Sequence, residues 1–328
     1  MKVEQELVNI APQRETLLTI GVFDGVHAGH RCLLENLERR AREKNLLSGV
    51  VTFNPHPQSV LHPHSQLPWL LDLKGRIESL QELDIGLVVV LSFTPELSRL
   101  SAREFISLLV KHLRMRGLMV GPDFVLGRGR EGNTELLSSL GQEMGFSVES
   151  IAPFTIDGEI ASSTLIRQTL AQGNMTKVKK LMGHSFYLIG KVITTNKRGR
   201  ILGFPTANLD IKPQQALPGN GVYATITQVD DKQFASVTNI GTRPTFGNGE
   251  IWVETHLLNY EGNLYNKEIR VEFVQKLRGE WGFASSEELT SQIGKDIQEA
   301  EAILSKEQST VSIKLMADSN GHIKARGS

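Results

Sequence analysis

The sequence predicts two domains of different fold class, an α/β domain with a parallel sheet followed by a small antiparallel β-barrel with a terminal helix. Over residues 16–182, apolar strand-like runs alternate with amphipathic helical patterns, as they do in βαβ units. From residue 186 onward, short strands are separated by Gly, Pro, Asn and Asp clusters, which is typical of an antiparallel barrel. A single amphipathic pattern over 285–304 then predicts one helix after the barrel.

Length, charge and cysteine content limit the class of protein. The 328 residues leave room for two domains, and 40% of them are hydrophobic, which is enough for substantial cores. Lys plus Arg equals Asp plus Glu, 36 each, so the net charge gives no reason to expect a nucleic-acid partner. Cys32 is the only cysteine, which excludes an internal disulfide framework and favours a reducing compartment.

No segment has the pattern of a membrane span or a secretion signal. No apolar run approaches the length that crosses a bilayer, and residues 1–15 lack the hydrophobic region of a signal peptide. We therefore expect a soluble cytoplasmic protein, with no membrane association and no obligate protein partner evident.

The first domain is expected to span residues 1–183. Strands are expected at 17–23, 49–53, 85–91, 117–120 and 146–151, and helices at 31–43, 73–83, 101–113, 134–144, 162–170 and 174–182. The helix at 101–113 is introduced by a capping box of Ser101 and Glu104. Strands separated by helices predict right-handed crossovers and a parallel sheet.

The second domain is expected to span residues 184–305. Strands are expected at 187–194, 221–229, 234–239, 250–259 and 268–275, followed by the helix at 285–304. Residues 306–328 are polar and contain Gly and Ser, so we expect a loose tail.

Residues 19–30 join the first expected strand to the first expected helix through a glycine-rich turn. Gly21, Gly25 and Gly29 permit tight turns and a close approach of the backbone to a ligand. His27 and His30 lie beside the helix N-terminus, where free N–H groups and the helix dipole attract phosphate. A glycine-rich turn with two surface histidines is the simpler alternative, but the flanking strand and helix favour a phosphate site. The stretch matches neither the Walker phosphate loop nor the three-glycine dinucleotide motif.

Two further loops follow expected strands and are candidates for the same site. Asn54 comes directly after the second strand, and Asp123 lies near the start of the glycine-rich loop 121–133 after the fourth. Ligands of parallel sheets bind beyond the carboxyl ends of the strands, so both loops are expected near the histidine turn. The alternatives are a proline-bracketed turn for Asn54 and a solvated surface loop for Asp123.

A second candidate anion site opens the helix at 162–170. Ser162, Ser163 and Thr164 combine hydroxyl groups with helix N-terminal amides, and Arg167 adds a guanidinium one turn later. The alternative is an ordinary N-cap, which would fully account for Ser162. Capping does not require Arg167, so the arginine is the more informative residue.

The histidine turn resembles the signature of nucleotidyltransferases that share a Rossmann-like core with class I aminoacyl-tRNA synthetases. Together with the three later segments, it resembles the adenylyltransferase half of bacterial bifunctional riboflavin kinase/FAD synthetase, over residues 16 to about 182. The resemblance implies that the phosphate of FMN attacks the α-phosphorus of ATP, giving FAD and pyrophosphate. It also implies that His27 and His30 stabilise the reacting phosphates, with nucleotide or flavin bound by Gly21, Phe23, Asp24, Gly25, Gly29, Asn54, Asp123, Ser163, Thr164 and Arg167.

A polar segment at the start of the second domain has the residue types of a phosphate and metal site. Thr206 and Asn208 are two residues apart, so both side chains face the same way in an extended segment. Their neutral oxygens can orient Mg²⁺ and its phosphates, and the basic turn at 196–200 precedes them. Glu254 lies on a later strand. For both segments, a strand with a solvent-facing polar side is the alternative.

Residues 186–304 resemble the riboflavin kinase module in three motifs, which occur in the same order: 203–208, 239–246 and 254–256. The resemblance implies a closed β-barrel that transfers the ATP γ-phosphate to the 5′-hydroxyl of riboflavin. It assigns Glu254 as the general base, Thr206 and Asn208 as Mg²⁺–nucleotide ligands, and Gly199, Arg200, Gly203 and Pro205 to nucleotide or flavin binding. The chain departs from the family near 194–196, where a Gly-x-Gly-like start is usual and only Gly199 is present nearby.

Three functions are compatible with these patterns. The first is a bifunctional enzyme that uses ATP and Mg²⁺, with riboflavin, FMN and FAD as substrates and products rather than prosthetic groups. The second is a nucleotidyltransferase for another phosphate ester, with the barrel as an accessory. The third is a flavin or nucleotide sensor without turnover. The matching second domain disfavours the second function, and the complete set of expected catalytic residues disfavours the third.

Overall fold

The computed structural model describes residues 1–64, 67–194, 203–242 and 251–321, with side chains through Glu307. The chain divides into two compact units. The first comprises Met1–Ile166, Leu181–Gly183 and Gln214–Ala216, and the second comprises Arg167–Lys180, His184–Pro213 and Leu217–Ser328. The domain boundary expected near residue 183 stays a prediction, because the segment Arg167–Lys180 groups with the second unit. Among the described residues, no helix is long and apolar enough to cross a membrane.

The first unit contains a five-stranded parallel sheet, as the sequence predicts. Its strands are β1 (Thr16–Ile20), β2 (Leu47–Asn54), β3 (Leu87–Ser92), β4 (Met115–Val120) and β5 (Ser147–Ser150). They are ordered β3-β2-β1-β4-β5, and every neighbouring pair is parallel. The chain therefore reverses its direction of winding between β1 and β4, which is the topological switch point where ligands bind in such sheets.

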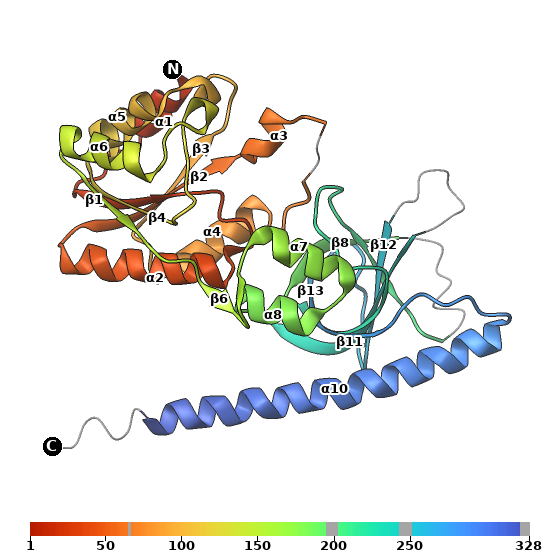
Figure 1. The fold of residues 1–328 in the computed structure, drawn as a ribbon. Helices are drawn as coiled ribbons and strands as arrows, with labels where there is room; N and C mark the ends of the chain where they lie inside the picture. The colour runs from red at the N-terminus through yellow and green to blue at the C-terminus, as the bar shows by residue number, and fades with distance from the viewer. Residues whose placement is uncertain (65–66, 195–202, 243–250, 322–328) are drawn as a thin grey trace. The chain divides into compact units, whose positions relative to one another are not determined.

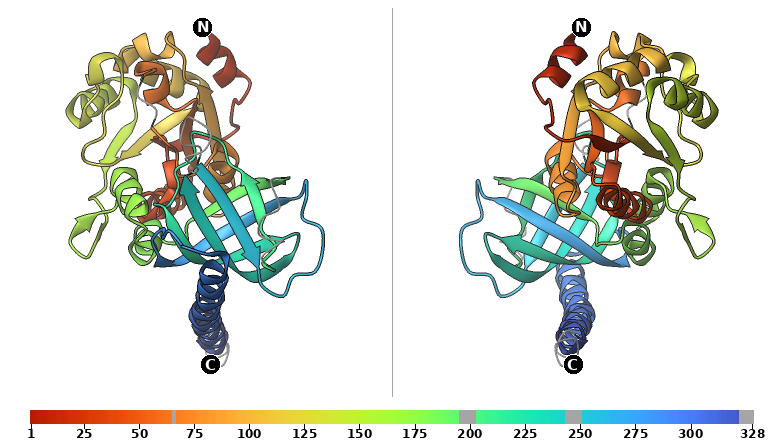
Figure 2. Two further views of the ribbon diagram at one scale, coloured as in Figure 1. Left: turned by 90° about the vertical axis from the view of Figure 1, so that its right-hand side faces the viewer. Right: turned by 90° about the vertical axis from the view of Figure 1, so that its left-hand side faces the viewer.

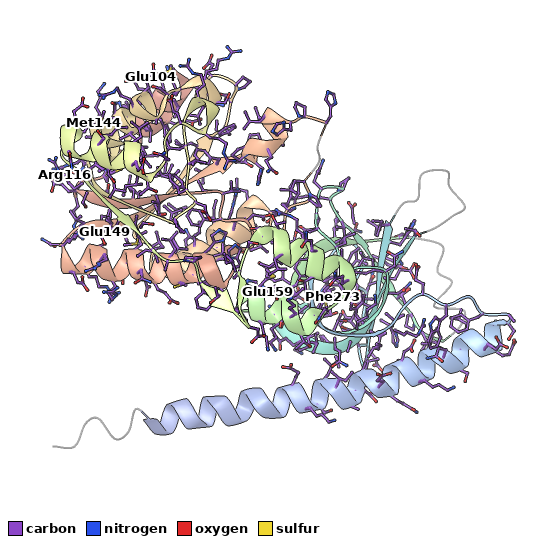
Figure 3. All side chains as sticks on the ribbon, viewed as in Figure 1. Glu104, Arg116, Met144, Glu149, Glu159 and Phe273 are labelled. Carbon is purple, nitrogen blue, oxygen red and sulfur yellow. The ribbon has the colours of Figure 1, made fainter. Side chains whose placement is uncertain are left out.

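Helices cover both faces of this sheet (Figure 1). One layer consists of α1 (Lys2–Val8), α5 (Ala102–Leu113) and α6 (Thr134–Met144), and the other of α2 (Ala28–Glu43) and α4 (Leu73–Gln81). The central strand β1 is buried on both sides: Leu18 belongs to the core under the first layer, and Leu17 to the core under the second. Glu104, labelled in Figure 3, closes the expected capping box with Ser101.

Several boundaries differ from the expected ones. Helix α2 begins at Ala28 rather than at residue 31, because the His27 side chain caps its N-terminus and accepts the His30 N–H. His30 therefore lies in the first helical turn and not in the preceding loop. The sequence patterns also missed α1 and the short α3 (Pro57–Leu61), which follows β2.

The segment after β5 leads out of the sheet. A small hairpin of β6 (Thr155–Ile156) and β7 (Glu159–Ile160), not anticipated from the sequence, precedes the expected helices; Glu159 is labelled in Figure 3. Those helices are α7 (Ser163–Gln172) and α8 (Met175–Met182). Ser162 caps α7 by accepting the Leu165 N–H at 3.3 Å, which matches the simple alternative for this serine.

The second unit contains a closed six-stranded antiparallel barrel, which confirms the expected fold class (Figure 2). Its strands are β8 (Tyr187–Ile193), β9 (Ala207–Asp210), β10 (Gly221–Val229), β11 (Lys232–Thr242), β12 (Ile251–Leu257) and β13 (Glu268–Arg278). They close in the order β10-β11-β12-β9-β8-β13. The four-residue β9 was expected only as an extended segment.

The barrel interior combines aromatic and hydroxyl side chains. Phe273, labelled in Figure 3, packs edge-on against Tyr223 with 5.4 Å between the ring centroids. Elsewhere inside the barrel, five fully buried hydroxyl groups bond to one another or to the backbone: Thr225, Thr227, Ser236, Thr238 and Thr255. Because these hydroxyls are paired, their burial costs little.

The barrel carries one long helix at its C-terminal end. Helix α10 (Ser286–Gly321) packs Ala300 and Leu304 against Val222 and Ala224 of β10. The helix extends past the expected end at 304, so the expectation of a loose tail is wrong for residues 306–321, whose backbone is helical. Polar composition alone does not distinguish a loose tail from a solvated helix.

Candidate functional sites

A cavity of about 290 Å³ lies at the switch point of the parallel sheet. The end of β1, the turn after it and the first turn of α2 line one side. The loop after β4 and the segment from the end of β5 to β7 line the other. Of the site residues expected in the first domain, the cavity is lined by Gly21, Phe23, His27, Gly29, His30 and Asp123. The histidine turn and the loop after β4 therefore come together as the sequence predicts.

The two histidines form a stacked pair at the N-terminus of α2. Their ring centroids lie 3.7 Å apart with the planes 19° from parallel. The Nδ1 atom of His27 accepts the His30 backbone N–H at 3.3 Å, so neutral His27 carries its proton on Nε2. That nitrogen is then a hydrogen-bond donor for a phosphate oxygen.

His30 is set up to remain neutral. Its Nδ1 atom is enclosed and has no hydrogen-bond partner. Burial, and secondarily the neighbouring His27, holds the pKa of His30 well below its usual value. An enclosed polar atom without a partner is costly in the protein alone, so this arrangement favours a ligand group that supplies the missing interaction.

Thr19 is a wall residue of the cavity that the sequence patterns did not single out. Its side chain is fully buried on β1, and its Oγ1 atom has no hydrogen-bond partner. A threonine inside an apolar strand looks like a core residue, so nothing in the sequence marks it. Phe124 and Phe154 also line the cavity and give it an apolar surface suited to a flat ring system.

Asp24 does not line the cavity. Its carboxylate accepts the backbone N–H groups of Leu70 at 2.9 Å and Leu71 at 3.1 Å, and only 4% of the residue is exposed. The adjacent Gly25 packs against Leu70 and has a positive φ of 81°. Both residues, expected to bind nucleotide, thus hold the shape of the turn.

The remaining candidates of the first domain lie outside the cavity wall. Ser163 donates its hydroxyl to the Asp24 carbonyl at 3.0 Å, and Thr164 beside it is exposed. Asn54 is exposed at the end of β2. Arg167 lies one turn along α7, in the segment that groups with the second unit.

The second set of expected residues meets on the barrel. Asn208 on β9 lies directly opposite Glu254 on β12, and Glu254 lies opposite Asn239 on β11. Directly opposed residues project to the same face with their Cβ atoms roughly 5 Å apart. Asn208 is 5% exposed, and its Oδ1 atom is enclosed without a hydrogen-bond partner. The structure therefore brings the expected base beside an expected metal ligand.

The segment before β9 supplies the rest of this site. Thr206 is half-buried, and Gly203 and Pro205 are exposed, with Gly203 at a φ of 85°. The ring of His256 donates from Nδ1 to the Pro205 carbonyl at 2.8 Å, which fixes this segment to β12. Gly199 and Arg200 lie outside the described residues.

Comparisons with known proteins assign both units. Residues 9–165 match the family model described as FAD synthetase, and residues 182–304 match the one described as riboflavin kinase. A bifunctional riboflavin kinase/FMN adenylyltransferase from Escherichia coli K12 is 40% identical over 300 residues, covering 90% of this chain and 96% of that protein. The chain belongs to this family. It phosphorylates riboflavin to FMN with ATP and adenylylates FMN to FAD with release of pyrophosphate.

Other members of the bifunctional riboflavin kinase/FMN adenylyltransferase family span the same length. One from Pseudomonas fluorescens is 38% identical over 306 residues, covering 92% of this chain and 98% of that protein. A crystal structure described as a macrolide-efflux protein from Streptococcus pneumoniae has a TM-score of 0.84 and 26% identity, covering 92% of this chain and 97% of its own. The likeness to that structure extends over both units of the fold.

Proposed function

We propose that the two reactions take place at two separate sites, adenylyl transfer at the cavity beside His27 and His30 and riboflavin phosphorylation beside Asn208 and Glu254. The observation that carries this proposal is the grouping of the residues. The stacked histidines lie wholly within the first unit, and the Asn208–Glu254 pair lies wholly within the barrel unit. Each unit thus contains its own pair of candidate reacting groups.

In adenylyl transfer, a phosphate oxygen of FMN forms a bond to the α-phosphorus of ATP while the bond to the β-phosphate oxygen breaks. Pyrophosphate leaves with the electron pair. His27 donates from Nε2 to a phosphate oxygen. The N-terminal amides of α2 donate further hydrogen bonds to the phosphates. Gly29 allows the start of α2 to lie close to Ala161, since a Cβ at position 29 would lie 3.0 Å from the Ala161 carbonyl oxygen.

The substrates of this reaction are assigned to the cavity by chemistry. Phe124 and Phe154 offer apolar faces for the flavin, and Asp123 lies beside them on the loop after β4. Arg167, Ser163 and Thr164, which do not line the cavity, are assigned to the triphosphate from the family resemblance. The Ser163 hydroxyl bonds to the Asp24 carbonyl, so we assign its contribution to the start of α7 rather than to a free hydroxyl.

In riboflavin phosphorylation, the 5′-hydroxyl oxygen attacks the γ-phosphorus of ATP and ADP leaves. Glu254 accepts the hydroxyl proton as the new P–O bond forms. Asn208, fixed opposite Glu254 by the strand register, keeps the nucleotide phosphates next to that base. Gly203 and Pro205, with the turn containing Gly199 and Arg200, are assigned to nucleotide or flavin binding.

The residues of the barrel site fit Mg²⁺. The enclosed Oδ1 of Asn208 has no protein partner, and Thr206 lies two residues before it. Such neutral oxygens hold Mg²⁺ together with substrate phosphates. When bound, Mg²⁺ neutralises phosphate charge. Among the described residues no group of three His, Cys, Asp or Glu side chains forms a metal site, so we assign the ion to this oxygen set.

Both reactions consume ATP, which supports a cytoplasmic enzyme whose partners are the small molecules riboflavin, FMN and ATP. The decisive experiment incubates the purified chain with riboflavin and MgATP and separates riboflavin, FMN and FAD over time. FMN should appear first and FAD afterwards. A second incubation supplied with FMN should give FAD without delay. If neither FMN nor FAD accumulates, the chain catalyses neither reaction and the two-site assignment is wrong.

A further inference from the structure

The turn that carries the histidines has an unfavourable backbone conformation. Phe23 has a φ of 55° and Val26 a φ of 37°, although neither residue is glycine. Positive φ is rare for non-glycine residues, and for a β-branched residue such as valine it is an outlier. Such a conformation persists only where surrounding contacts impose it.

Arg76, on α4, supplies two of these contacts. Its Nη1 atom donates to the Val22 carbonyl at 2.6 Å, and its Nη2 atom donates to the Phe53 carbonyl at 3.1 Å. The first carbonyl lies at the start of the strained turn, and the second lies near the end of β2. Thr52 also donates to the Val22 carbonyl, at 3.0 Å. One guanidinium thus links the backbones of two ligand-side loops.

The charge of Arg76 is accommodated without contact with the cavity. The residue is 6% exposed and is not among those that line the cavity. Burial lowers the pKa of Arg76, and the neighbouring carboxylates of Asp24 and Asp72 oppose that effect. Asp24 in turn accepts the N–H groups of Leu70 and Leu71. The guanidinium therefore bonds to two backbone carbonyls and is favoured electrostatically by two carboxylates, and its position suits holding the turn rather than binding substrate.

The backbone geometry of the turn determines where the side chains of His27 and His30 lie. His27 follows Val26 and caps α2 through the His30 N–H, and the two rings stack. A shift of the Val22 carbonyl would therefore move both rings relative to the cavity. Misplacement of a catalytic group by about 1 Å costs roughly 10²-fold in rate.

We propose that Arg76 is a positioning residue for adenylyl transfer, which holds the histidine turn and the end of β2 in their working geometry through the Val22 and Phe53 carbonyls. The inference rests on the proposed location of adenylyl transfer at His27 and His30. It assigns to Arg76 an effect on the rate of FAD formation and none on riboflavin phosphorylation. The hydrogen bond from Thr52 to the Val22 carbonyl helps to hold the same turn, with a smaller effect on the rate.

The test replaces Arg76 by methionine, which keeps an unbranched stem but lacks the guanidinium and its donors. Arg76→Met should lower kcat for FAD formation about 10²-fold, with a much smaller change in KM for FMN. Arg76→Lys keeps the charge but has a single nitrogen in place of the two that reach the Val22 and Phe53 carbonyls, so it should recover only part of the lost rate. Riboflavin phosphorylation, measured in the same samples, should stay at the wild-type rate.

A matched control is available at Arg14. Its guanidinium also reaches two backbone carbonyls, of Asn45 at 3.3 Å and Leu46 at 3.4 Å, but these precede β2 at the opposite end of the strand. Arg14→Met should leave kcat for FAD formation unchanged. If a folded Arg76→Met variant keeps the wild-type kcat, or if Arg14→Met lowers it equally, the positioning role is wrong.

Two further variants keep the outcome decisive. Should Arg76→Met fail to fold, Thr52→Val decides, because it removes one bond to the same carbonyl in an isosteric side chain; its kcat should fall about threefold to tenfold. A wild-type kcat in Thr52→Val would then overturn the proposal. His30→Ala is assayed in parallel. If His30→Ala forms FAD at the wild-type rate, the proposed site itself is wrong; if its rate falls and that of Arg76→Met stays at the wild-type value, only the positioning role is wrong.

Discussion

The two proposed sites of this chain are held in shape by different means. In the first unit, the histidine turn has positive φ angles at Phe23 and Val26 and is fixed by side chains from distant segments, among them Arg76 and Ser163. In the barrel, Asn208 and Glu254 face each other because the register of β9 and β12 places them so. The first site depends on particular long-range hydrogen bonds, whereas the second depends on a repeating strand ladder.

This difference predicts different sensitivities to substitution. Around the cavity, residues that touch no substrate can still control the rate, because they fix the backbone that carries the histidines. Successive side chains of β12 point to opposite faces of the strand. Glu254 lies on the face of the proposed site, while the next residue, Thr255, is fully buried and bonds to Thr238. Substitutions in the barrel should therefore affect either the chemistry or the fold, rarely both.

The largest expected effect is on the barrel site. Glu254→Gln keeps the shape of the side chain but removes the base, so FMN formation should slow by about 10²–10⁴-fold. Riboflavin and ATP binding should remain close to wild type, and FAD formation from supplied FMN should be unchanged. Glu272→Gln, at a half-buried carboxylate on β13, is the matched control. Wild-type FMN formation by Glu254→Gln would show that another group takes the proton.

The second effect tests the cavity in the same way. His30→Ala removes one of the two stacked rings, and FAD formation from FMN should fall by about 10²–10³-fold, the range for loss of one preorganised donor. Riboflavin phosphorylation should stay near the wild-type rate. His112→Ala, at a histidine of α5 that contacts Glu4, controls for loss of a partly enclosed imidazole. Loss of both activities in folded His30→Ala would contradict the separation of the sites.

A smaller effect is expected at Asn208, with opposite signs for stability and function. Its enclosed Oδ1 has no partner, so Asn208→Leu should leave the free energy of unfolding unchanged or raise it by about 1 kcal/mol. The same change removes a proposed ligand of Mg²⁺–ATP, so the concentration of MgATP needed for half-maximal FMN formation should rise about tenfold. Thermal melts check the predicted stability, and MgATP titrations check the predicted rise in the MgATP requirement. A large loss of stability would show that Asn208 has a structural role instead.

The sequence predicted both folds, and it marked the candidate reacting residues, because these signals are local. The histidine turn places its glycines and both histidines within 12 consecutive residues, and the strands of both units have clear patterns. The register that joins Asn208 to Glu254 could be expected only from the family resemblance, since it depends on pairing between distant strands.

The residues that the sequence did not reveal act through partners far along the chain. Arg76 occupies an amphipathic helix, where an arginine looks solvated, and its partners Val22 and Phe53 come from other segments. Asp24 is expected to bind nucleotide because it stands inside the motif, and the sequence did not reveal that its carboxylate accepts the backbone N–H groups of Leu70 and Leu71. Burial and long-range hydrogen bonding decide these roles, and neither can be predicted from the local composition of the sequence.

The smallest expected effect concerns the neutral state of His30. Burial lowers its pKa in the folded protein below the value of about 6.5 that it has when unfolded. The unfolded chain therefore binds the proton more readily, and the folded state loses stability as the pH falls below about 6.5, by at most about 1.4 kcal/mol per pH unit. His30→Phe keeps a stacking ring that does not titrate. The melting temperature of the wild-type chain, relative to that of His30→Phe, should thus fall between pH 7.5 and pH 5.5. All other titrating groups are common to the two proteins and cancel, so an unchanged difference would mean that folding does not hold His30 neutral.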